Sequence, residues 1–323
     1  MNSTDKKSRA RRSAGRSANR SKRSSVTVIG AGRMGTTLAR AVSEAGYSVE
    51  LILSKHAASA RRAGRALGTA GGALDRLGDQ VTRDRLLRSQ ILIISTPDDA
   101  LPLAARQLAS AWPRTRKSAK TPRPSALHTS GAASSEVLAQ LRNAGFAIGS
   151  LHPLVSVATT KTDPVVFRGA YFCVEGDREA VAVARTMVRK IGGRSFTLNS
   201  KSKPLYHAAA VMSSGHITAL FDLAIEMLRA CGLSAADAQK ILLPLLETNT
   251  QNLKLKTPAQ ALTGPFARGD RSTVEKHLAA LKASRVDDAI EAYTIMGRHS
   301  LRLAGKNLPP EALDRIAKLL SRR

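Results

Sequence analysis

Three glycines near the N-terminus have the spacing of a loop that binds the pyrophosphate of a dinucleotide. They follow the short apolar run 26–29 and precede a helical pattern, and this strand–turn–helix context makes the spacing informative. The first glycine permits a tight turn, the second lets backbone amides approach the phosphates, and the third lets the helix pack closely. We predict that the cofactor-binding loop comprises Gly30, Ala31, Gly32, Arg33, Met34 and Gly35.

The residues after the second apolar run, 49–53, indicate which dinucleotide binds. Enzymes that use NAD usually carry an acidic residue about 20 positions after the glycines, whereas this chain has Ser54 and Lys55 there. A hydroxyl and a cation suit the 2′-phosphate of NADP, so we predict NADP (NADPH) as the cofactor, bound in part by these two residues. Arg61 and Arg62 either extend this site or form an exposed helical face.

A further apolar run, 91–94, ends in residues that we expect beside the cofactor. Ligands of such sheets bind outside the carboxyl ends of the strands. The residues at this strand end are Ser95, Thr96 and Pro97. Proline has no N–H group and is suited to turning the chain away from the nicotinamide. We therefore predict these three residues as cofactor-binding residues.

Hydride transfer to a carbonyl or imine also needs a group that donates a proton or stabilises the developing anion. His128 and Ser130 end one predicted strand, His152 ends the next, and Lys203 and His207 lie four residues apart on one helix face. We predict Lys203, His128 and His207 as catalytic candidates, and Ser130 and His152 as substrate-binding residues. The alternatives are hydrogen-bonded turn histidines and a capping or surface lysine.

The elements that would position these residues alternate between strand and helix in the first 200 residues. A helix is expected over 34–45 and another from Ser134 to about Asn143. This alternation predicts an α/β Rossmann domain, doubly wound with a mainly parallel sheet. About six buried strands are expected, at 26–29, 49–53, 91–94, 126–128, 146–149 and 170–174.

After residue 200 the strand patterns stop, and an all-α C-terminal domain is expected. A long helix over 204–230 is followed by one that Ser234 caps and that ends near residue 253. Ser272 and Glu275 have the spacing of a capping box. Further helices are predicted over 286–304 and 310–320. The predicted domains are a tail over 1–24, an NADP-binding domain over 25–200 and a helical substrate and dimerisation domain over 201–323.

The chain of 323 residues has a formal net charge of +27, part of which lies in its first 25 residues. That segment is rich in Arg and Ser without apolar periodicity, so we expect a disordered basic tail. A second basic stretch, 111–124, resembles an exposed loop. The charge of the tail would also favour non-specific contact with nucleic acid. Two cysteines and the lack of a long apolar run predict a cytoplasmic protein with no membrane segment and no metal site.

Four further segments, together with the glycine loop, resemble the Rossmann-like family known as domain of unknown function 2520. The likeness covers roughly residues 25–320. This family is similar to pyrroline-5-carboxylate reductase, ketopantoate reductase, prephenate dehydrogenase and the beta-hydroxyacid dehydrogenases. The segments are Ala126-Leu127-His128-Thr129-Ser130-Gly131-Ala132, Gly149-Ser150-Leu151-His152-Pro153-Leu154, Lys203-Pro204-Leu205-Tyr206-His207-Ala208-Ala209 and Gly264-Pro265-Phe266-Ala267-Arg268-Gly269-Asp270.

The resemblance implies roles for two of the candidate residues. In beta-hydroxyacid dehydrogenases a lysine at the start of the long interdomain helix is the acid/base, which points to Lys203. In prephenate dehydrogenases a His-Pro pair lies near the substrate, which points to His152. It also implies a C-terminal domain resembling the 6-phosphogluconate dehydrogenase type and a homodimer through that domain.

Together these features predict an NADP-dependent oxidoreductase that transfers hydride between NADP(H) and a small keto or imino metabolite. The basic surface would attract an anionic substrate. The alternative is a non-catalytic regulatory protein that binds NADP.

Overall fold

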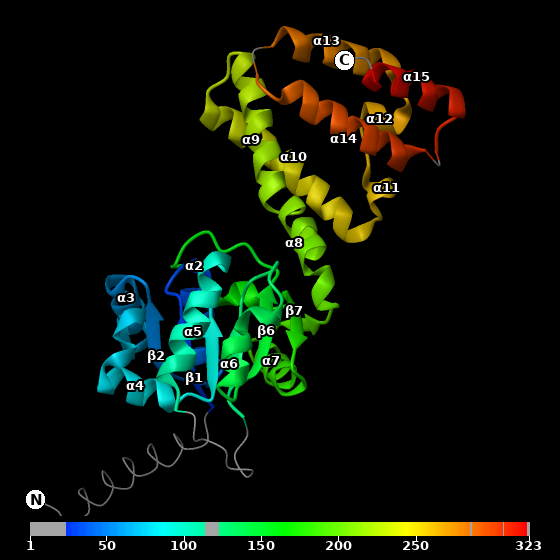
Figure 1. The fold of residues 1–323 in the computed structure, drawn as a ribbon. Coiled ribbons are helices and arrows are strands. Elements are labelled where there is room, and N and C mark those ends of the chain that lie inside the picture. Colours follow the sequence, from blue (N-terminus) through cyan, green and yellow to red (C-terminus); the bar gives the residue numbers. More distant parts are fainter. Residues whose placement is uncertain (1–23, 114–122, 285, 306, 322–323) are drawn as a thin grey trace, which may run out of the picture. The chain divides into compact units, whose positions relative to one another are not determined.

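The computed structural model describes residues 24–113, 123–284, 286–305 and 307–321. The predicted basic tail, except its last residue, and most of the basic loop at 111–124 lie outside the described residues. The chain divides into two compact units, Met1–Val211 and Met212–Arg323 (Figure 1). The predicted domain boundary at residue 200 follows the end of the sheet, whereas the first unit also contains nearly all of the next helix, Lys203–Met212.

The first unit is built on an eight-stranded sheet in the order β3-β2-β1-β4-β5-β6-β7-β8. The strands from β3 to β6 run parallel to one another, β7 runs antiparallel to β6, and β8 is parallel to β7. The sheet is therefore mainly parallel, as predicted. The strands are β1 (Ser25–Ile29), β2 (Ser48–Ser54), β3 (Ala70–Ala73), β4 (Ile91–Ile94), β5 (Ser125–His128), β6 (Ala147–Pro153), β7 (Tyr171–Gly176) and β8 (Arg194–Phe196).

Two short strands, β3 and β8, were not predicted from the sequence. The residues of β3 are Ala-Gly-Gly-Ala, which lack the β-branched side chains that mark a strand, and β8 has only three residues. Strand β6 is longer than predicted, so that His152 lies within the strand and pairs with Cys173 of β7. These differences extend the two edges of the sheet and leave its predicted centre unchanged.

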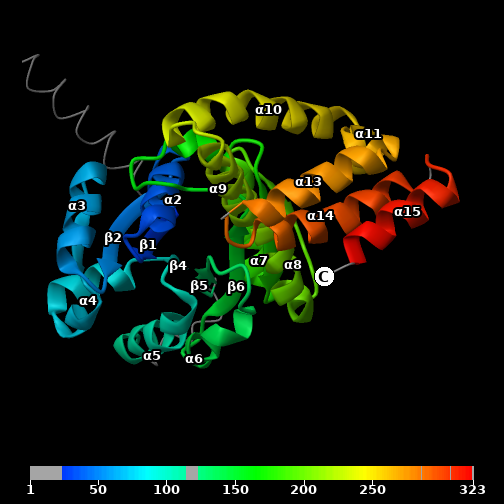
Figure 2. The same cartoon turned by 90° about the horizontal axis from the view of Figure 1, so that it is seen from above.

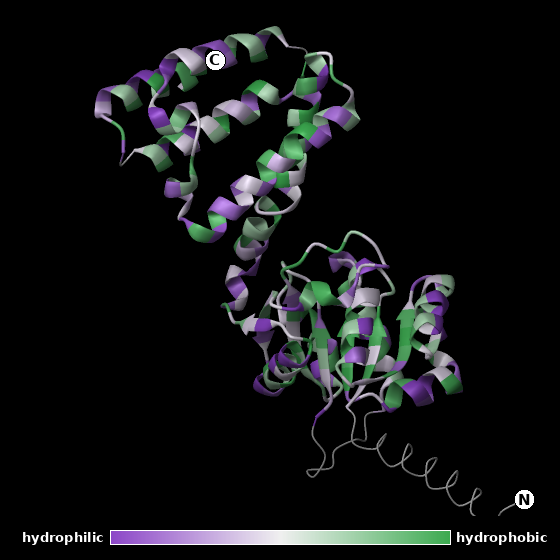
Figure 3. Ribbon diagram, turned by 180° about the vertical axis from the view of Figure 1, so that it is seen from behind, coloured by the Kyte–Doolittle hydropathy of each residue, from purple (hydrophilic) through white to green (hydrophobic). Residues whose placement is uncertain are grey.

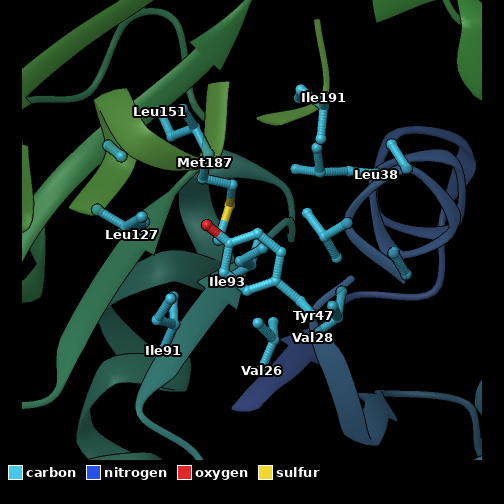
Figure 4. Close-up of a cluster of buried hydrophobic side chains, with 14 of the residues drawn as sticks. Val26, Val28, Leu38, Tyr47, Ile91, Ile93, Leu127, Leu151, Met187 and Ile191 are labelled. Carbon is cyan, nitrogen blue, oxygen red and sulfur yellow. The ribbon is translucent and has the colours of Figure 1, made fainter. Parts of the chain in front are cut away.

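Helices cover both faces of the sheet, because successive strand residues point to opposite sides. Val26 and Val28 pack with α2 and α7 on one face, as Figure 4 shows, while Ile29 packs with α5 on the other. Figure 3 shows hydrophobic residues concentrated in the strands. The helices of the first unit are α2 (Arg33–Glu44), α3 (Ala57–Leu67), α4 (Gln80–Leu87), α5 (Leu101–Ala111), α6 (Ala139–Asn143), α7 (Arg178–Lys190) and α8 (Lys203–Met212), the last of which ends one residue beyond it.

The second unit consists of helices in the part that the structure describes, as predicted (Figure 2). Its small core contains Phe266, Val274, Leu301, Ile316 and Leu320. The helices are α9 (Gly215–Ala230), α10 (Ala235–Leu255), α11 (Pro258–Ala261), α12 (Pro265–Arg268), α13 (Arg271–Ala283), α14 (Ala289–Ala304) and α15 (Pro310–Ser321).

Two helix predictions were wrong. The predicted helix over 204–230 is interrupted between α8 and α9 at Ser213 and Ser214, since serine followed by glycine favours a turn over a helix interior. The predicted capping box of Ser272 and Glu275 does not form. Asp270 instead caps α13, because its carboxylate accepts a hydrogen bond from the Thr273 amide at 3.1 Å.

The stretch Ser200–Ala230 is long and apolar enough to span a membrane by length and composition alone. The break between α8 and α9 divides it into helices of 10 and 16 residues. Each is shorter than the roughly 20 residues that one spanning helix needs. The exposed apolar residues of this stretch include Leu205, Ile217 and Leu220.

Candidate functional site

The glycine loop forms a tight turn at the carboxyl end of β1. Gly30 has a φ of 107°, and a Cβ atom there would overlap the carbonyl oxygen of Ser95. A Cβ atom on Gly35 would overlap the Gly30 carbonyl oxygen, so both positions require glycine. At Gly32, in contrast, an added Cβ atom would have no atom of the described residues within 4 Å. The open space at Gly32 is where a ligand can approach the backbone.

The N-terminus of α2 faces this opening with properties that suit a phosphate. Gly32 is the N-cap residue, no side chain caps the helix, and its first turn carries no acidic residue among those described. Unpaired amides and the helix dipole there favour an anion. The exposed Arg33 adds a positive charge. This turn therefore fits the pyrophosphate of a dinucleotide.

The neighbouring strand β2 ends in the residues predicted to distinguish NADP from NAD. Ser54 is its last residue, and Lys55 and His56 follow it in exposed positions. Arg61 and Arg62 are exposed on α3. This arrangement offers a hydroxyl and several cations at the strand end, and no carboxylate follows β2 directly. It is compatible with a 2′-phosphate.

The residues that follow β4 connect the glycine loop to the catalytic candidates at the end of β5. The Ser95 amide donates to the Ile29 carbonyl oxygen at 2.6 Å, and the Thr129 hydroxyl donates to Ser95 Oγ at 3.1 Å. Thr96 Oγ1 is buried and has no hydrogen-bond partner among the described residues, while Pro97 is exposed. The carboxyl ends of β1, β4 and β5 thus form one continuous edge.

His128, the last residue of β5, is fully buried. Its Nδ1 accepts a hydrogen bond from the Ser130 amide at 3.2 Å, so the loop after the strand folds back onto the ring. Burial, and then the nearby charge of Lys203, lower the pKa of His128 to about 3. The ring is therefore neutral near pH 7, and the structure places it inside the turn.

Ser130 is also engaged within the loop. Its hydroxyl donates to Asp98 at 2.7 Å and accepts from the amides of Ala132 and Ala133 at 3.2 and 2.9 Å. A serine hydroxyl has one donor and two acceptor positions, and all three are used. Ser130 therefore holds the loop against Asp98 at the end of β4.

Lys203 begins α8 and lies with its side chain fully buried. Its Nζ donates to the Ser130 carbonyl oxygen at 3.2 Å and to Ser150 Oγ at 2.5 Å, and it forms an ion pair with Glu175 Oε1 at 3.6 Å. Burial lowers the pKa of Lys203, and the Glu175 carboxylate opposes that shift. This network joins α8 to β6, β7 and the loop after β5.

Glu175 extends this network to a further element. Its carboxylate accepts from the amide of Ser135 and from the hydroxyl of Ser135, both at 2.8 Å. Ser135 begins the short 3₁₀ helix Ser135–Leu138. A buried carboxylate is stable only when it is paired and hydrogen-bonded, and Glu175 meets both conditions.

The partly buried rings of His152, Tyr206 and His207 form a group beside Gly131. His152 Nδ1 and the Tyr206 hydroxyl are 2.6 Å apart, and the centroids of the His152 and His207 rings are 5.3 Å apart. A Cβ atom on Gly131 would overlap His207 Nδ1 and lie 2.8 Å from His152 Nε2. Burial lowers the pKa of His152 to about 4 and raises the pKa of Tyr206.

The structure thus brings together all five predicted candidates, His128, Ser130, His152, Lys203 and His207, within the first unit. Sequence reasoning missed the polar residues that partner them. The sequence contained a signal for two of these partners. Glu175 is the only acidic residue in the apolar strand 171–176, and Asp98 directly follows the predicted strand end at residues 95–97. The other partners that were missed are Ser135, Ser150 and Tyr206.

Comparison with protein families agrees with this geometry. The model of the Rossmann-like domain matches residues 10–153, and that of the domain of unknown function DUF2520 matches residues 170–300. The two models match the chain one after the other, in agreement with the resemblance seen in the sequence. None of the curated proteins matches the chain.

Solved structures share the fold over most of the chain. A Bacteroides fragilis protein provisionally assigned as an NADP oxidoreductase has 20% identity and a TM-score of 0.68, with 87% of this chain and 98% of that chain covered. A reductive aminase from Aspergillus terreus, in complex with NADPH and ethyl levulinate, has 18% identity, coverage of 92% and 99%, and a TM-score of 0.60. A pyrroline-5-carboxylate reductase from Coxiella burnetii has 13% identity, coverage of 93% and 99%, and a TM-score of 0.54.

Proposed function

We propose that this chain, which matches the model of a Rossmann-like domain and then that of DUF2520, is an NADP-dependent oxidoreductase that transfers hydride between NADP(H) and a small keto or imino metabolite. The observation that carries the proposal is the turn at Gly30, Gly32 and Gly35, which is closed at its first and third glycines and open at Gly32, beside the N-terminus of α2. Proteins of this fold described as NADP-dependent reductases support it.

The chain's own residues supply the binding contacts in this proposal. The loop of residues 30–35 holds the pyrophosphate, and Ser54 and Lys55 hold the 2′-phosphate. Residues 95–97 line the nicotinamide side, since they follow β4 beside the glycine turn. The proton donor comes from the polar groups gathered at the ends of β5 and β6. An anionic substrate is favoured by the net charge of +27.

A homodimer through the helical unit is part of this proposal. Helix α9 has 16 residues and buries none of them, although it is rich in Leu and Ile. A two-fold dimer uses the same surface on both subunits, so a second copy of the chain would cover this apolar face with its own α9. We also place the protein in the cytoplasm, since both cysteines, buried Cys173 and exposed Cys231, are free thiols.

Binding of NADPH and NADH to the purified full-length chain, followed by fluorescence, tests the cofactor assignment. Gly32→Asp places a carboxylate in the space reserved for the pyrophosphate, so it should weaken binding of both nucleotides about 100-fold or more. Gly78→Asp is the matched control, because Gly78 is equally open, has no positive φ, and lies away from the turn. Lys55→Ala should weaken binding of NADPH and spare NADH.

The outcomes separate the alternatives. Tight binding of NADPH with weak binding of NADH supports the proposal, and turnover of a keto or imino probe completes it. Binding of neither nucleotide to the wild-type chain would overturn it. Tight NADPH binding without turnover of any carbonyl or imine would favour the regulatory alternative.

A further inference from the structure

The groups that could give a proton to a reduced substrate differ in whether their protons are already engaged. Lys203 has three N–H bonds, and its Nζ contacts three acceptors, which are the Ser130 carbonyl oxygen, Ser150 Oγ and Glu175 Oε1. Its side chain has no exposed surface. A substrate therefore meets no free N–H of this lysine, which acts through the loop and the strand that it holds.

His128 and Ser130 are both buried at the end of β5 and in the loop that follows it. The His128 ring is fully buried and binds the amide of Ser130, and all three hydrogen-bonding positions of the Ser130 hydroxyl are occupied. Since His128 Nδ1 accepts from that amide, the proton of the neutral ring lies on Nε2, which is buried and has no hydrogen-bond partner among the described residues. Release of the Ser130 proton would break its hydrogen bond to Asp98. Both residues shape the loop that carries Gly131.

His152 and Tyr206 are only partly buried and lie at the carboxyl edge of the sheet. The hydroxyl and Nδ1 are 2.6 Å apart, a short hydrogen bond, and the rings are nearly perpendicular at 87°. Gly131 makes this arrangement possible, because any larger residue there would displace the imidazole rings of His152 and His207. The pair follows the glycine turn along the edge formed by β1, β4, β5 and β6.

We propose that the Tyr206 hydroxyl, supported by a hydrogen bond from His152 Nδ1–H, delivers the proton that the reduced carbonyl or imine takes up. This assignment rests on the proposed NADP-dependent reduction. It makes Tyr206 the catalytic acid, with His152 behind it. Lys203 is then a positioning residue, because it fixes α8 and the Ser130 loop so that Tyr206 faces His152.

The step balances in protons and electrons. The hydride that NADPH supplies when bound adds to the carbon of the C=O or C=N bond, and the π electrons move to oxygen or nitrogen. That atom takes the Tyr206 proton, the phenolate takes the proton from His152 Nδ1, and His152 Nε2 takes one from water, which leaves as hydroxide. Exchange of the ring proton with solvent then returns His152 from the Nε2–H form to the Nδ1–H form. In the opposite direction of reaction the same protons move in reverse.

The surroundings of the pair suit this sequence. Burial keeps the pKa of Tyr206 above its usual value, so the phenol holds its proton until a stronger base forms beside it. Burial, His207 and Lys203 lower the pKa of His152 to about 4, so the imidazole is neutral near pH 7. The other titratable groups near the pair are His128 and Cys173. A neutral imidazole carries its single proton on one nitrogen, and the proposal requires Nδ1.

The first test needs no substrate. Long-range ¹⁵N–¹H NMR on the full-length chain labelled in histidine reports which ring nitrogen of His152 carries the proton. The expected result is the Nδ1–H form in the wild type and a change toward Nε2–H in Tyr206→Phe. An Nε2–H form in the wild type would overturn the proposal, because the Tyr206 proton would then point to His152 and away from the substrate.

The second test measures NADPH binding and NADPH oxidation with 2-methyl-1-pyrroline and pyruvate as probes. Tyr206→Phe should lower kcat about 10²- to 10⁴-fold and leave the Kd for NADPH within about twofold. Tyr47→Phe is the matched control. It removes a hydroxyl just before β2, at the amino ends of the parallel strands and thus away from the carboxyl ends where Tyr206 lies. Undiminished turnover by Tyr206→Phe would overturn the proposal, whereas failure of the wild-type chain to bind NADPH would instead overturn the proposed function.

A third variant addresses the geometry directly. Gly131→Ala adds one methyl group that must displace the rings of His152 and His207, both of which are side-chain ends that can move. The expected result is loss of the Nδ1–H signature and of turnover with NADPH binding retained. Retention of both signals in Gly131→Ala would show that the pair is not held as the structure has it, and would overturn the proposal.

Discussion

His128 makes the stability of the first unit depend on pH. Its folded pKa of about 3 lies below the ordinary value of 6.5. Between these values the unfolded chain binds a proton that the folded chain does not bind. The contribution of His128 is therefore fully present above pH 6.5 and is lost as the pH falls toward 3. Between pH 7 and pH 5 the loss is about 2 kcal/mol.

The replacement His128→Asn tests this origin. An asparagine side chain accepts a hydrogen bond from the amide two residues on, as His128 does from Ser130, but it does not titrate. Urea unfolding at pH 7 and pH 5 should show that the free energy of unfolding falls by about 2 kcal/mol less in the variant than in the wild type. An equal loss in both proteins would mean that His128 is already protonated in the folded chain.

The polar network illustrates what a sequence reveals about single residues. The glycine turn was predictable because its meaning is local, with three glycines between a strand and a helix. Lys203 and His128 were identified as chemical candidates by residue type and strand position. The ion pair of Lys203 with Glu175 was not predictable, because residues from distant segments meet only through the register of β6 and β7. The same holds for the bond between Tyr206 and His152.

At the scale of an element, the start of α13 offers a direct comparison of two capping residues. Asp270 accepts from the Thr273 amide at 3.1 Å and from the Thr273 hydroxyl at 2.7 Å, whereas Ser272 lies inside the first turn. Removal of an N-cap side chain costs about 1 kcal/mol. Asp270→Ala should therefore speed hydrogen exchange in peptides from α13 about fivefold.

Ser272→Ala is the matched control for this measurement, since both changes remove one small polar side chain two positions apart. It should leave exchange in α13 unchanged. Faster exchange in Ser272→Ala than in Asp270→Ala would restore the capping box expected from the sequence. Sequence alone could not choose between them, because Asp and Ser are equally good N-cap residues and the choice depends on where the chain turns into the helix.

The strands of the sheet were easier to predict from the sequence than the point at which one long helix breaks into two. The apolar runs predicted the central strands, since each is short and followed by turn residues, and those at 26–29 and 91–94 consist mainly of β-branched residues. The break between α8 and α9 was missed because the apolar pattern continues across Ser213 and Ser214. It matters for function, because it ends the helix that carries Tyr206 and His207 soon after these residues, so that this helix packs with the sheet unit.

At the scale of the whole molecule, the charge of +27 and the apolar surface of the helical unit act in opposite directions. Two copies of the chain repel each other electrostatically, while burial of the exposed apolar side chains favours their association at about 25 cal/mol per Å². Salt screens the repulsion and leaves the hydrophobic contribution in place. The residues concerned are Met212, Ile217, Leu220, Ile241, Leu245 and Leu255, which range from 40% to 84% exposed.

The proposed homodimer should therefore become tighter as the salt concentration rises, which is the reverse of what charge-driven contact with nucleic acid would show. Sedimentation of the full-length chain at low and moderate salt measures this directly. The double change Leu220→Glu with Ile241→Glu should give monomers at both concentrations, because it buries charge in the contact. Val81→Glu, at a residue that is 65% exposed on α4, is the matched control and should remain dimeric. A wild-type chain that sediments as a monomer at both salt concentrations would rule out the dimer. It would also leave the apolar face of α9 and α10 in need of a different partner.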